Sequence, residues 1–553
     1  MKNFSPMLFT CLKDYNKKTF ISDLIAGIIV AVIALPLSIA LALASGVGPE
    51  EGLYTAIIAG FLISFFGGST VQISGPTAAF ATIVAGVVVT HGMDGLITAT
   101  VLAGVILVLM GVFKLGGLIK FIPYTITTGF TAGIAVTILV GQLKDFFGLT
   151  YGADVKPIET MEKIEAVIHH FSTVNVWAIA VGLLALAILI VWPFISKKIP
   201  GSLIAVIVGI VAVKVLGHFD IHVNTIGDLY TISSKLPSFT MPDLSYEMIR
   251  SSLPDAFTIA ILAAIESLLS CVVADGMIGK KHRSNTELVA QGLGNVASAL
   301  FGGIPATGAI ARTAANVKNG GQTPISGMVH AVVLLLVLVL LMPLAGWIPM
   351  PTIAAILFMV AYNMSHWEGF VHMLKTSSKT DSLVLLTSFG LTVFFDLVMA
   401  IYVGMALACL LFMKKMSDET ELKSWKYLEQ LTDEEREKES RQLMAVPAEI
   451  RVYEITGPLF FGDANVLESI IVRSYTRCLI IRMRGVPYLD SSAMSSLIQL
   501  YERCKRLDIN LILSHVNERP KASMKKAGFI DMVGEENFCE NIEAAIARAK
   551  ELI

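Results

Sequence analysis

The sequence predicts a polytopic α-helical membrane protein that carries a cytoplasmic α/β domain. The membrane part is expected to have 14 spans, arranged as a 7+7 inverted repeat with two half-helices that follow short extended segments. Of the 553 residues, 54% are hydrophobic and 16% are charged, which is too apolar a composition for a soluble protein of this length. Apolar stretches recur up to Met413, and short strands alternate with helices after Ala448.

The apolar stretches are separated by Gly, Pro or charged residues, and they define the expected spans. They run over residues 24–45, 53–66, 77–90, 96–113, 122–144, 176–194, 202–217, 256–275, 287–300, 309–317, 325–346, 352–364, 382–395 and 397–413. The stretches 77–90 and 309–317 are shorter than the roughly 20 residues that cross the hydrocarbon. Irregular backbone at this depth is tolerated only inside protein or against a wet cavity. We therefore expect these two to be half-helices.

The charges of the connections indicate an orientation. If the N-terminus is cytoplasmic, sixteen Lys and Arg residues fall on the cytoplasmic side of the membrane and four fall in connections on the opposite side. The N-terminal segment is polar and has no small-residue cleavage site after the first apolar run, so it does not look like a cleaved signal peptide. Both termini are expected in the cytoplasm.

Composition divides the chain into four parts. We expect a cytoplasmic N-terminal segment at 1–22, a transmembrane domain at 23–416, a charged linker at 417–447 and a soluble domain at 448–553. In the soluble domain the expected strands are 450–455, 478–483 and 510–514, and the expected helices are 464–474, 491–507, 520–527 and 541–552. Such alternation implies a layered βα sheet.

The two halves of the membrane part share a pattern of small residues. Gly52-Leu53 leads to Gly67-Gly68 and Ser74-Gly75-Pro76-Thr77-Ala78-Ala79, whereas Gly292-Leu293 leads to Gly302-Gly303 and Thr307-Gly308-Ala309-Ile310-Ala311-Arg312. An odd number of spans per half gives the repeats opposite orientations, so the half-helices can begin near the midplane with facing N-termini. Small residues also serve helix packing in membranes, and this alternative stays open.

Two ionisable residues lie within apolar segments, Glu266 in 259–273 and Arg312 in 304–317. Such a group costs several kcal/mol in hydrocarbon and is kept mainly where it lines a pathway or binds something. Two helix N-termini supply roughly +0.5 of a charge each, and Arg312 adds a full charge with planar donors suited to a carboxylate or sulfate. The sequence therefore predicts an anion carrier.

The residues around the two helix starts complete the predicted substrate site. Gly75 and Gly308 let the backbone approach a ligand, Thr77 and Thr313 offer hydroxyl donors, and Ala78, Ala79, Ala309 and Ala311 leave room. The substrate is expected to be a small anion. No cofactor is expected besides a coupling ion, H⁺ or else Na⁺.

Glu266 is the predicted ion-coupling residue. Desolvation favours its neutral form and Arg312 favours its ionised form, so the sequence does not fix its state. A neutral Glu266 carries one H⁺ and leaves a site matched to a divalent anion, whereas an ionised one suits a monovalent anion or an anion bound with Na⁺. Proton-coupled import of a dianion is our hypothesis. The alternative is a fixed Glu266–Arg312 ion pair that only joins two helices.

Other functions have less support. The six cysteines show no metal-ligand spacing, and His218 and His222 lack a third ligand, so no metal site is predicted. A net charge of −2 offers no general surface for nucleic acid. The chain has no Walker A sequence and no nucleophile–base constellation, so an enzyme is not expected.

Asp490-Ser491-Ser492 opens a helix directly after a strand of the soluble domain. One interpretation is plain N-capping, and the other is a phosphorylation or ligand site at the helix start. Asp490 and Ser491 are therefore the regulatory candidates.

These residues together resemble the SulP family of anion transporters over essentially the whole chain. The matching stretches are Asp23-Leu24-Ile25-Ala26-Gly27, Leu35-Pro36-Leu37-Ser38, Gly52-Leu53-Tyr54, Ser74-Gly75-Pro76-Thr77-Ala78, Ala264-Ile265-Glu266-Ser267-Leu268-Leu269 and Ala309-Ile310-Ala311-Arg312-Thr313-Ala314-Ala315-Asn316. The resemblance implies a C-terminal STAS domain and a substrate held between the third and tenth spans. It adds Leu37 and Ser38 of the first span to the site, and it places Ser491 at a phosphoacceptor position, although Ala493 replaces the usual glycine.

Within this family the chain looks most similar to the bacterial DauA type of C4-dicarboxylate transporter, through Gly-Leu-Tyr-Thr-Ala, Ile-Glu-Ser-Leu-Leu and Ala-Ile-Ala-Arg-Thr-Ala-Ala-Asn. This similarity implies H⁺-coupled uptake of succinate, fumarate or aspartate by alternating access, in a homodimer of the bacterial inner membrane. It leaves open a cytoplasmic protein partner of the STAS domain. Sulfate transport and Na⁺-coupled bicarbonate transport are alternatives, and so is a sensor that binds an anion and signals through the STAS domain.

Overall fold

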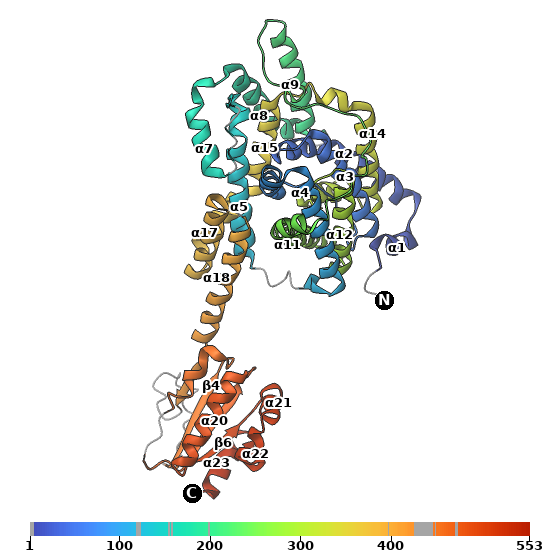
Figure 1. The fold of residues 1–553 in the computed structure, drawn as a ribbon. Helices are drawn as coiled ribbons and strands as arrows, with labels where there is room; N and C mark the ends of the chain where they lie inside the picture. Colours follow the sequence, from blue (N-terminus) through green and yellow to red (C-terminus); the bar gives the residue numbers. More distant parts are fainter. Residues whose placement is uncertain are drawn as a thin grey trace. The chain divides into compact units, whose positions relative to one another are not determined.

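The structure is a computed structural model of the chain (Figure 1). It describes residues 5–117, 123–152, 155, 157, 159–196, 199–395, 397–424, 446–447, 449–470 and 474–553. The chain forms two compact units, Met1–Met405 and Ala406–Ile553. Most of the expected linker 417–447 lies outside the described residues. The domain limits expected from the sequence stay predictions.

Long helices make up the first unit. They are α2 (Lys17–Ala44), α3 (Pro49–Phe66), α4 (Ala78–Val112), α5 (Tyr124–Gly141), α8 (Val176–Ile195), α9 (Gly201–Gly217), α11 (Tyr246–Ile278), α12 (Ser284–Leu300), α14 (Ile325–Ala345), α15 (Met350–Ser365) and α17 (Lys379–Phe394), followed by α18 (Leu397–Asp418). Shorter helices are α1 (Met7–Cys11), α6 (Leu143–Phe147), α7 (Thr160–His169), α10 (Ile226–Leu229), α13 (Ile310–Lys318) and α16 (Trp367–Thr376).

The expected apolar stretches fall on these helices. In the described part of the chain, seven helices are long and apolar enough to cross a membrane by length and composition. The helical membrane architecture is therefore confirmed, while the count of 14 spans stays a prediction.

The two expected half-helices are present. Gly92, with a φ of +68°, interrupts α4, so the part before it is a short helix that covers the stretch 77–90. α13 has 9 residues and covers 309–317. Each follows a two-residue strand, β1 (Ser74–Gly75) or β2 (Thr307–Gly308), and these strands pair antiparallel. The pairing brings the starts of both half-helices to one place in the protein.

Small residues let the helices of this unit approach closely. A Cβ atom on Gly292 of α12 would lie 2.4 Å from the carbonyl oxygen of Gly104 in α4, and one on Gly104 would lie 2.7 Å from the carbonyl oxygen of Gly292. The backbones are thus in direct contact, as is common between membrane helices. Gly292 therefore serves packing, which is the alternative that the sequence had left open for part of the repeated pattern.

The second unit contains a five-stranded sheet of order β3-β4-β5-β6-β7. Its strands are β3 (Glu421–Ser424), β4 (Ile450–Thr456), β5 (Cys478–Gly485), β6 (Asn510–Ser514) and β7 (Phe538–Cys539), and its helices are α20 (Ser491–Arg506), α21 (Glu518–Lys526), α22 (Phe529–Val533) and α23 (Ile542–Glu551). β3 runs antiparallel to β4, and the other neighbours are parallel. The layered α/β prediction is confirmed.

Alternating residues of β5 face two different apolar cores. Leu479 and Ile481 belong to the core that includes Leu497 of α20, whereas Ile480 packs in the core that includes Ala545 of α23. Burial on both faces explains why this strand reads as a continuous apolar run.

One expected helix of this unit is wrong in its described part. Residues 464–466 end the 3₁₀ helix η5 (Phe461–Val466), and residues 467–469 form a turn. Residues 471–473 of the expected helix lie outside the described residues.

Candidate functional site

Arg312 lies in the first turn of α13 and is 3% exposed. Its Nη2 donates a hydrogen bond to the carbonyl oxygen of Pro76 over 2.8 Å. Its Nη1 is buried and has no hydrogen-bond partner in the described part of the protein. One nitrogen thus orients the guanidinium on the segment that leads into the other half-helix.

Gly75 makes room for this guanidinium. A Cβ atom on Gly75 would lie 2.7 Å from Nη1 of Arg312, which is closer than real Cβ contacts. The glycine in the segment before the half-helix is therefore needed by the arginine, and not only by an approaching ligand.

Backbone and hydroxyl groups hold the two helix starts together. The Ala309 amide donates to the carbonyl oxygen of Ile73 over 2.8 Å, and the Ile73 amide donates to Oγ1 of Thr313 over 3.0 Å. The Gly308 amide donates to Oγ of Ser267 in α11 over 3.0 Å. Thr313 thus contributes to the geometry of the site by accepting a backbone hydrogen bond.

Glu266 lies in α11 and is partly exposed. Its Oε2 accepts a hydrogen bond from the Thr77 hydroxyl over 3.0 Å. None of the ion pairs formed by described residues joins Glu266 to Arg312. The fixed ion pair considered from the sequence is therefore not observed, because each residue has its partner on the segment 76–77.

The small residues of the predicted site differ in exposure. Ala78 and Ala79, in the first turn of α4, are buried, and so is Ala309. Ala311 is exposed. Of these four alanines, only Ala311 therefore lies at the surface.

Leu37 and Ser38 follow Pro36 within α2, a helix that packs against α13. The Ser38 hydroxyl is buried without a hydrogen-bond partner among described residues. No hydrogen bond in the described part of the chain joins these two residues to α4 or α13. The structure therefore brings together Gly75, Thr77, Glu266 and Arg312, and it leaves Leu37 and Ser38 on a neighbouring helix.

Glu287 is a buried carboxylate that the sequence reasoning did not single out. It accepts hydrogen bonds from the amides of Gly68 and Ser69 and from the side chains of Gln72 and Gln291, over 2.8 to 3.1 Å. It therefore anchors the segment that leads into β1. The available signal was an acidic residue at the start of an apolar stretch, four residues before a glutamine.

Asp23 forms a second anchor that the sequence reasoning missed. In the first two turns of α2, it accepts hydrogen bonds from the amides of Gln322 and Thr323 over 2.7 and 3.1 Å, and another from the Tyr15 hydroxyl over 3.3 Å. Burial, and then the adjacent Asp23 carboxylate, raise the pKa of Tyr15 to about 12. The phenol therefore stays a donor throughout the neutral pH range.

In the second unit, Asp490 caps α20. Its Oδ1 accepts from the Ala493 amide over 2.8 Å, and its Oδ2 accepts from the Phe461 amide over 2.9 Å. The Ser491 side chain is exposed. The capping interpretation thus describes Asp490, while phosphorylation of Ser491 stays a prediction.

Comparisons with known proteins identify the family of the chain. The family model of the sulfate permease family matches residues 20–388, and that of the STAS domain matches residues 442–545. The chain belongs to the sulfate permease family. The protein named Putative sulfate transporter YvdB of Bacillus subtilis is 42% identical over 539 residues, which cover 96% of this chain and 98% of that protein. The bicarbonate transporter BicA of Picosynechococcus is 32% identical over 465 residues, 80% of this chain and 79% of that protein.

Solved structures share the fold. The transmembrane domain of a cyanobacterial bicarbonate transporter BicA matches with a TM-score of 0.63 and 30% identity, and it covers 71% of this chain and 98% of that domain. The overall structure of SLC26A9 matches with a TM-score of 0.85 and 18% identity, covering 98% of this chain and 92% of that one, which is a likeness of fold alone. The protein is thus a multi-pass membrane member of the sulfate permease family with a C-terminal STAS domain.

Proposed function

We propose that this protein is a secondary active transporter of a small anion, and that Arg312 binds the anion directly. The observation that carries the proposal is the buried Nη1 of Arg312, which has no partner among described residues and lies where the two half-helices begin. On this proposal the chain is not an enzyme and has no nucleic-acid partner.

The charges at this place favour an anion. Arg312 forms no ion pair with a described carboxylate. A guanidinium removed from water without a counter-ion is costly, and a bound anion supplies the missing partner. The N-terminus of each half-helix adds roughly half a positive charge and unpaired amides.

Sulfate and the C4-dicarboxylates succinate and fumarate are divalent anions that fit this charge, and aspartate offers the same two carboxylates with a net charge of −1. Sulfate has the additional support that a relative 42% identical to this chain carries the name of a sulfate transporter. Bicarbonate is a further candidate, because the BicA relatives carry the name of bicarbonate transporters. A monovalent anion would call for an ionised Glu266, which lowers the positive charge of the site by one.

Glu266 is proposed to carry the coupling proton. It lies on a helix adjacent to both half-helices and is partly exposed, so it can exchange a proton when the site opens. The Thr77 hydroxyl at 3.0 Å links its protonation to the first half-helix. During alternating access, H⁺ would thus bind to Glu266 and the anion to Arg312, both beside the N-termini of the two half-helices.

The test is uptake by the purified full chain in proteoliposomes. Sulfate, succinate, fumarate, aspartate and bicarbonate are compared, with pH and Na⁺ varied separately. We expect Arg312→Ala to lose binding and uptake, and Glu266→Gln to keep exchange of labelled substrate while losing accumulation driven by a pH gradient. The matched controls are Arg250→Gln and Glu247→Gln, both exposed on α11. Unaltered uptake and pH dependence in both site variants would show that this mechanism is wrong.

A sensor function would give a different result. It predicts anion binding, seen as a thermal shift that depends on Arg312, with no counterflow of labelled substrate.

We further propose a homodimer in the bacterial inner membrane, with both termini and the STAS domain in the cytoplasm and free to bind a protein there. Cysteine accessibility from each side of the membrane tests this orientation.

A further inference from the structure

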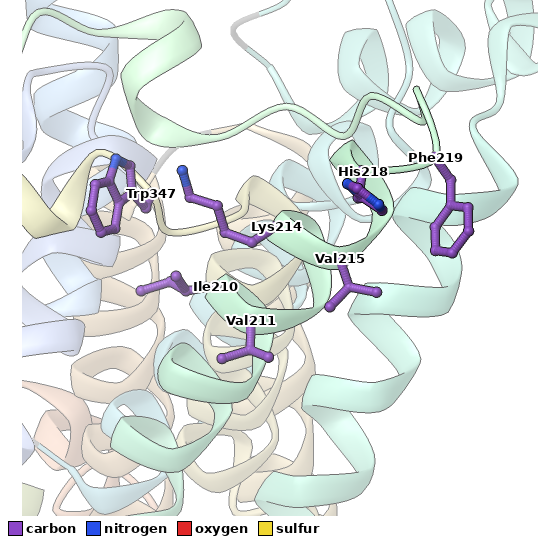
Figure 2. A pocket seen from close by; sticks show the side chains of 7 residues that line it. All are labelled: Ile210, Val211, Lys214, Val215, His218, Phe219 and Trp347. Atoms are coloured by element: carbon purple, nitrogen blue, oxygen red, sulfur yellow. The ribbon is translucent and has the colours of Figure 1, made fainter.

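An open groove of about 660 Å³ lies on the surface of α9 (Figure 2). Its lining residues are Ile210, Val211, Lys214, Val215, His218, Phe219 and Trp347. Val211, Val215 and Phe219 repeat every fourth residue and are 56%, 53% and 67% exposed. They therefore form one exposed apolar stripe that runs along α9 and into the turn after it.

The far wall of the groove is held in place by backbone hydrogen bonds. Trp347 lies in the turn between α14 and α15, and the segment after α9 pairs with this turn. Amides donate to carbonyl oxygens from Ile226 to Ile348 over 2.9 Å, from Gly227 to Gly346 over 3.0 Å and from Met350 to Asn224 over 2.9 Å. The groove is thus preformed, which lowers the entropic cost of an occupant.

Lys214 and His218 form the cationic part of the groove. The Lys214 ammonium lies 4.4 Å from the centroid of the Trp347 ring, and Figure 2 shows the side chain extending toward it. None of the ion pairs of described residues includes Lys214 or His218. His218 is one helical turn further on, on the same face as Lys214. A lysine above an apolar stripe, beside a tryptophan, has the polarity profile of a membrane interface.

We propose that this groove binds one anionic phospholipid. An acyl chain lies along Val211 and Val215, and the phosphate accepts hydrogen bonds from Lys214 and His218. The charge complementarity selects an anionic headgroup, and the apolar stripe selects a lipid over a free phosphate. The inference is independent of the proposed transport, because α9 contributes no residue to the site around Arg312.

Lys144 provides a matched control. It is also exposed and its ammonium also lies over an aromatic ring, 4.9 Å from the centroid of Tyr151, but it does not line the groove. A lysine that only extends toward an interface would behave like Lys144. Comparison of lipid binding by Lys214→Gln and Lys144→Gln therefore distinguishes a specific lipid site in the groove from a general effect of interfacial charge.

The experiment measures lipid binding to the purified full chain by native mass spectrometry, supported by thermal unfolding in detergent. The probes are phosphatidylglycerol, phosphatidylcholine and glycerol 3-phosphate. We expect phosphatidylglycerol to bind more tightly than phosphatidylcholine. Lys214→Gln should weaken phosphatidylglycerol about fivefold, which is the effect of about 1 kcal/mol for one basic residue at a lipid surface. Lys144→Gln should leave the preference unchanged.

A second variant tests the apolar part. Val215→Asn should weaken both lipids while leaving the difference between them, because it removes apolar surface and no charge. The proposal is overturned if Lys214→Gln and Lys144→Gln have equal effects, if Val215→Asn has none, or if glycerol 3-phosphate stabilises the protein as well as phosphatidylglycerol does.

Discussion

The hydroxyl of Thr77 donates to the carboxylate of Glu266 over 3.0 Å, across 189 positions of sequence. Thr77 is the N-cap of the first half-helix, and Glu266 lies in α11. A side chain that the sequence suggested as a substrate ligand is thus used to hold the proposed coupling residue. This contact makes the helix start and the carboxyl group parts of one unit.

Thr77→Val should reduce proton-driven uptake by about tenfold, because it removes the donor and leaves a carboxyl oxygen without its partner, a loss of 1–3 kcal/mol. Thr77→Ser keeps the donor and should retain most of the activity. Initial rates in proteoliposomes measure both. Equal rates in the valine and serine variants would mean that the hydrogen bond has no part in transport.

Gly75→Ala should lower anion affinity about tenfold or more. The added Cβ would lie 2.7 Å from Nη1 of Arg312 and displace the guanidinium, and forcing atoms into a packed place costs 1–3 kcal/mol. Gly86→Ala, in the half-helix that follows Gly75 and with nothing within 4 Å of the new Cβ, is the control. Anion-dependent thermal shifts give the affinities. An unchanged affinity for Gly75→Ala would show that the guanidinium does not need this space.

Asp23→Ala should lower the stability of the membrane part by about 1–3 kcal/mol, because the amides of Gln322 and Thr323 lose their acceptor. Asp14→Ala is a suitable control, since Asp14 is exposed. Thermal unfolding of the purified chain measures the difference. A variant as stable as the control would mean that water replaces the carboxylate at no cost.

Tyr15 predicts a pH dependence at the alkaline end. Its pKa is raised from 10.0 to about 12, so the folded protein binds more protons than the unfolded chain between these values. The stability that Tyr15 contributes is fully present below pH 10 and is lost as the pH rises through about 12. The difference in midpoint between the wild type and Tyr15→Phe should therefore shrink above pH 10. A constant difference at all pH values would contradict this assignment.

Asp490→Ala should open the first turn of α20. It removes the N-cap to the Ala493 amide, a change worth about 1 kcal/mol, so hydrogen exchange of this amide should be about fivefold faster. Asp490→Asn keeps a cap oxygen, and Ser491→Ala leaves the cap intact, so both should exchange like the wild type. Mass spectrometry of the peptide that contains Ala493, in the full chain, reads this out.

The sequence was sufficient for the secondary structure of most elements. Apolar stretches predicted helices because backbone groups in hydrocarbon must pair within one segment. The shortness of 309–317 and its preceding glycine predicted a half-helix after an extended segment. The expected helix at 464–474 is wrong in its described part, where a 3₁₀ helix (Phe461–Val466) begins at an amide bound to Asp490, a residue 29 positions away that local propensity does not include.

For the site, residue types were predictable and partners were not. The free-energy cost of a buried charge singled out Glu266 and Arg312 in the sequence. The same argument applies to Glu287, which the sequence reasoning missed and which is buried with four hydrogen bonds. The sequence left open an ion pair between Glu266 and Arg312. In the folded protein Glu266 instead accepts a hydrogen bond from Thr77, and Arg312 donates one to the carbonyl oxygen of Pro76. Both residues therefore bind the segment where the first half-helix begins.

By itself the sequence determined that this protein has a helical membrane part with two half-helices, ionisable residues within apolar segments, and an α/β domain. These follow from solvation free energies, which depend on residue type and spacing along the chain. Only the tertiary structure decided that one guanidinium nitrogen of Arg312 has no partner among the described residues, at the place where two half-helices begin. That outcome depends on the antiparallel pairing of β1 with β2, which joins segments more than 230 residues apart.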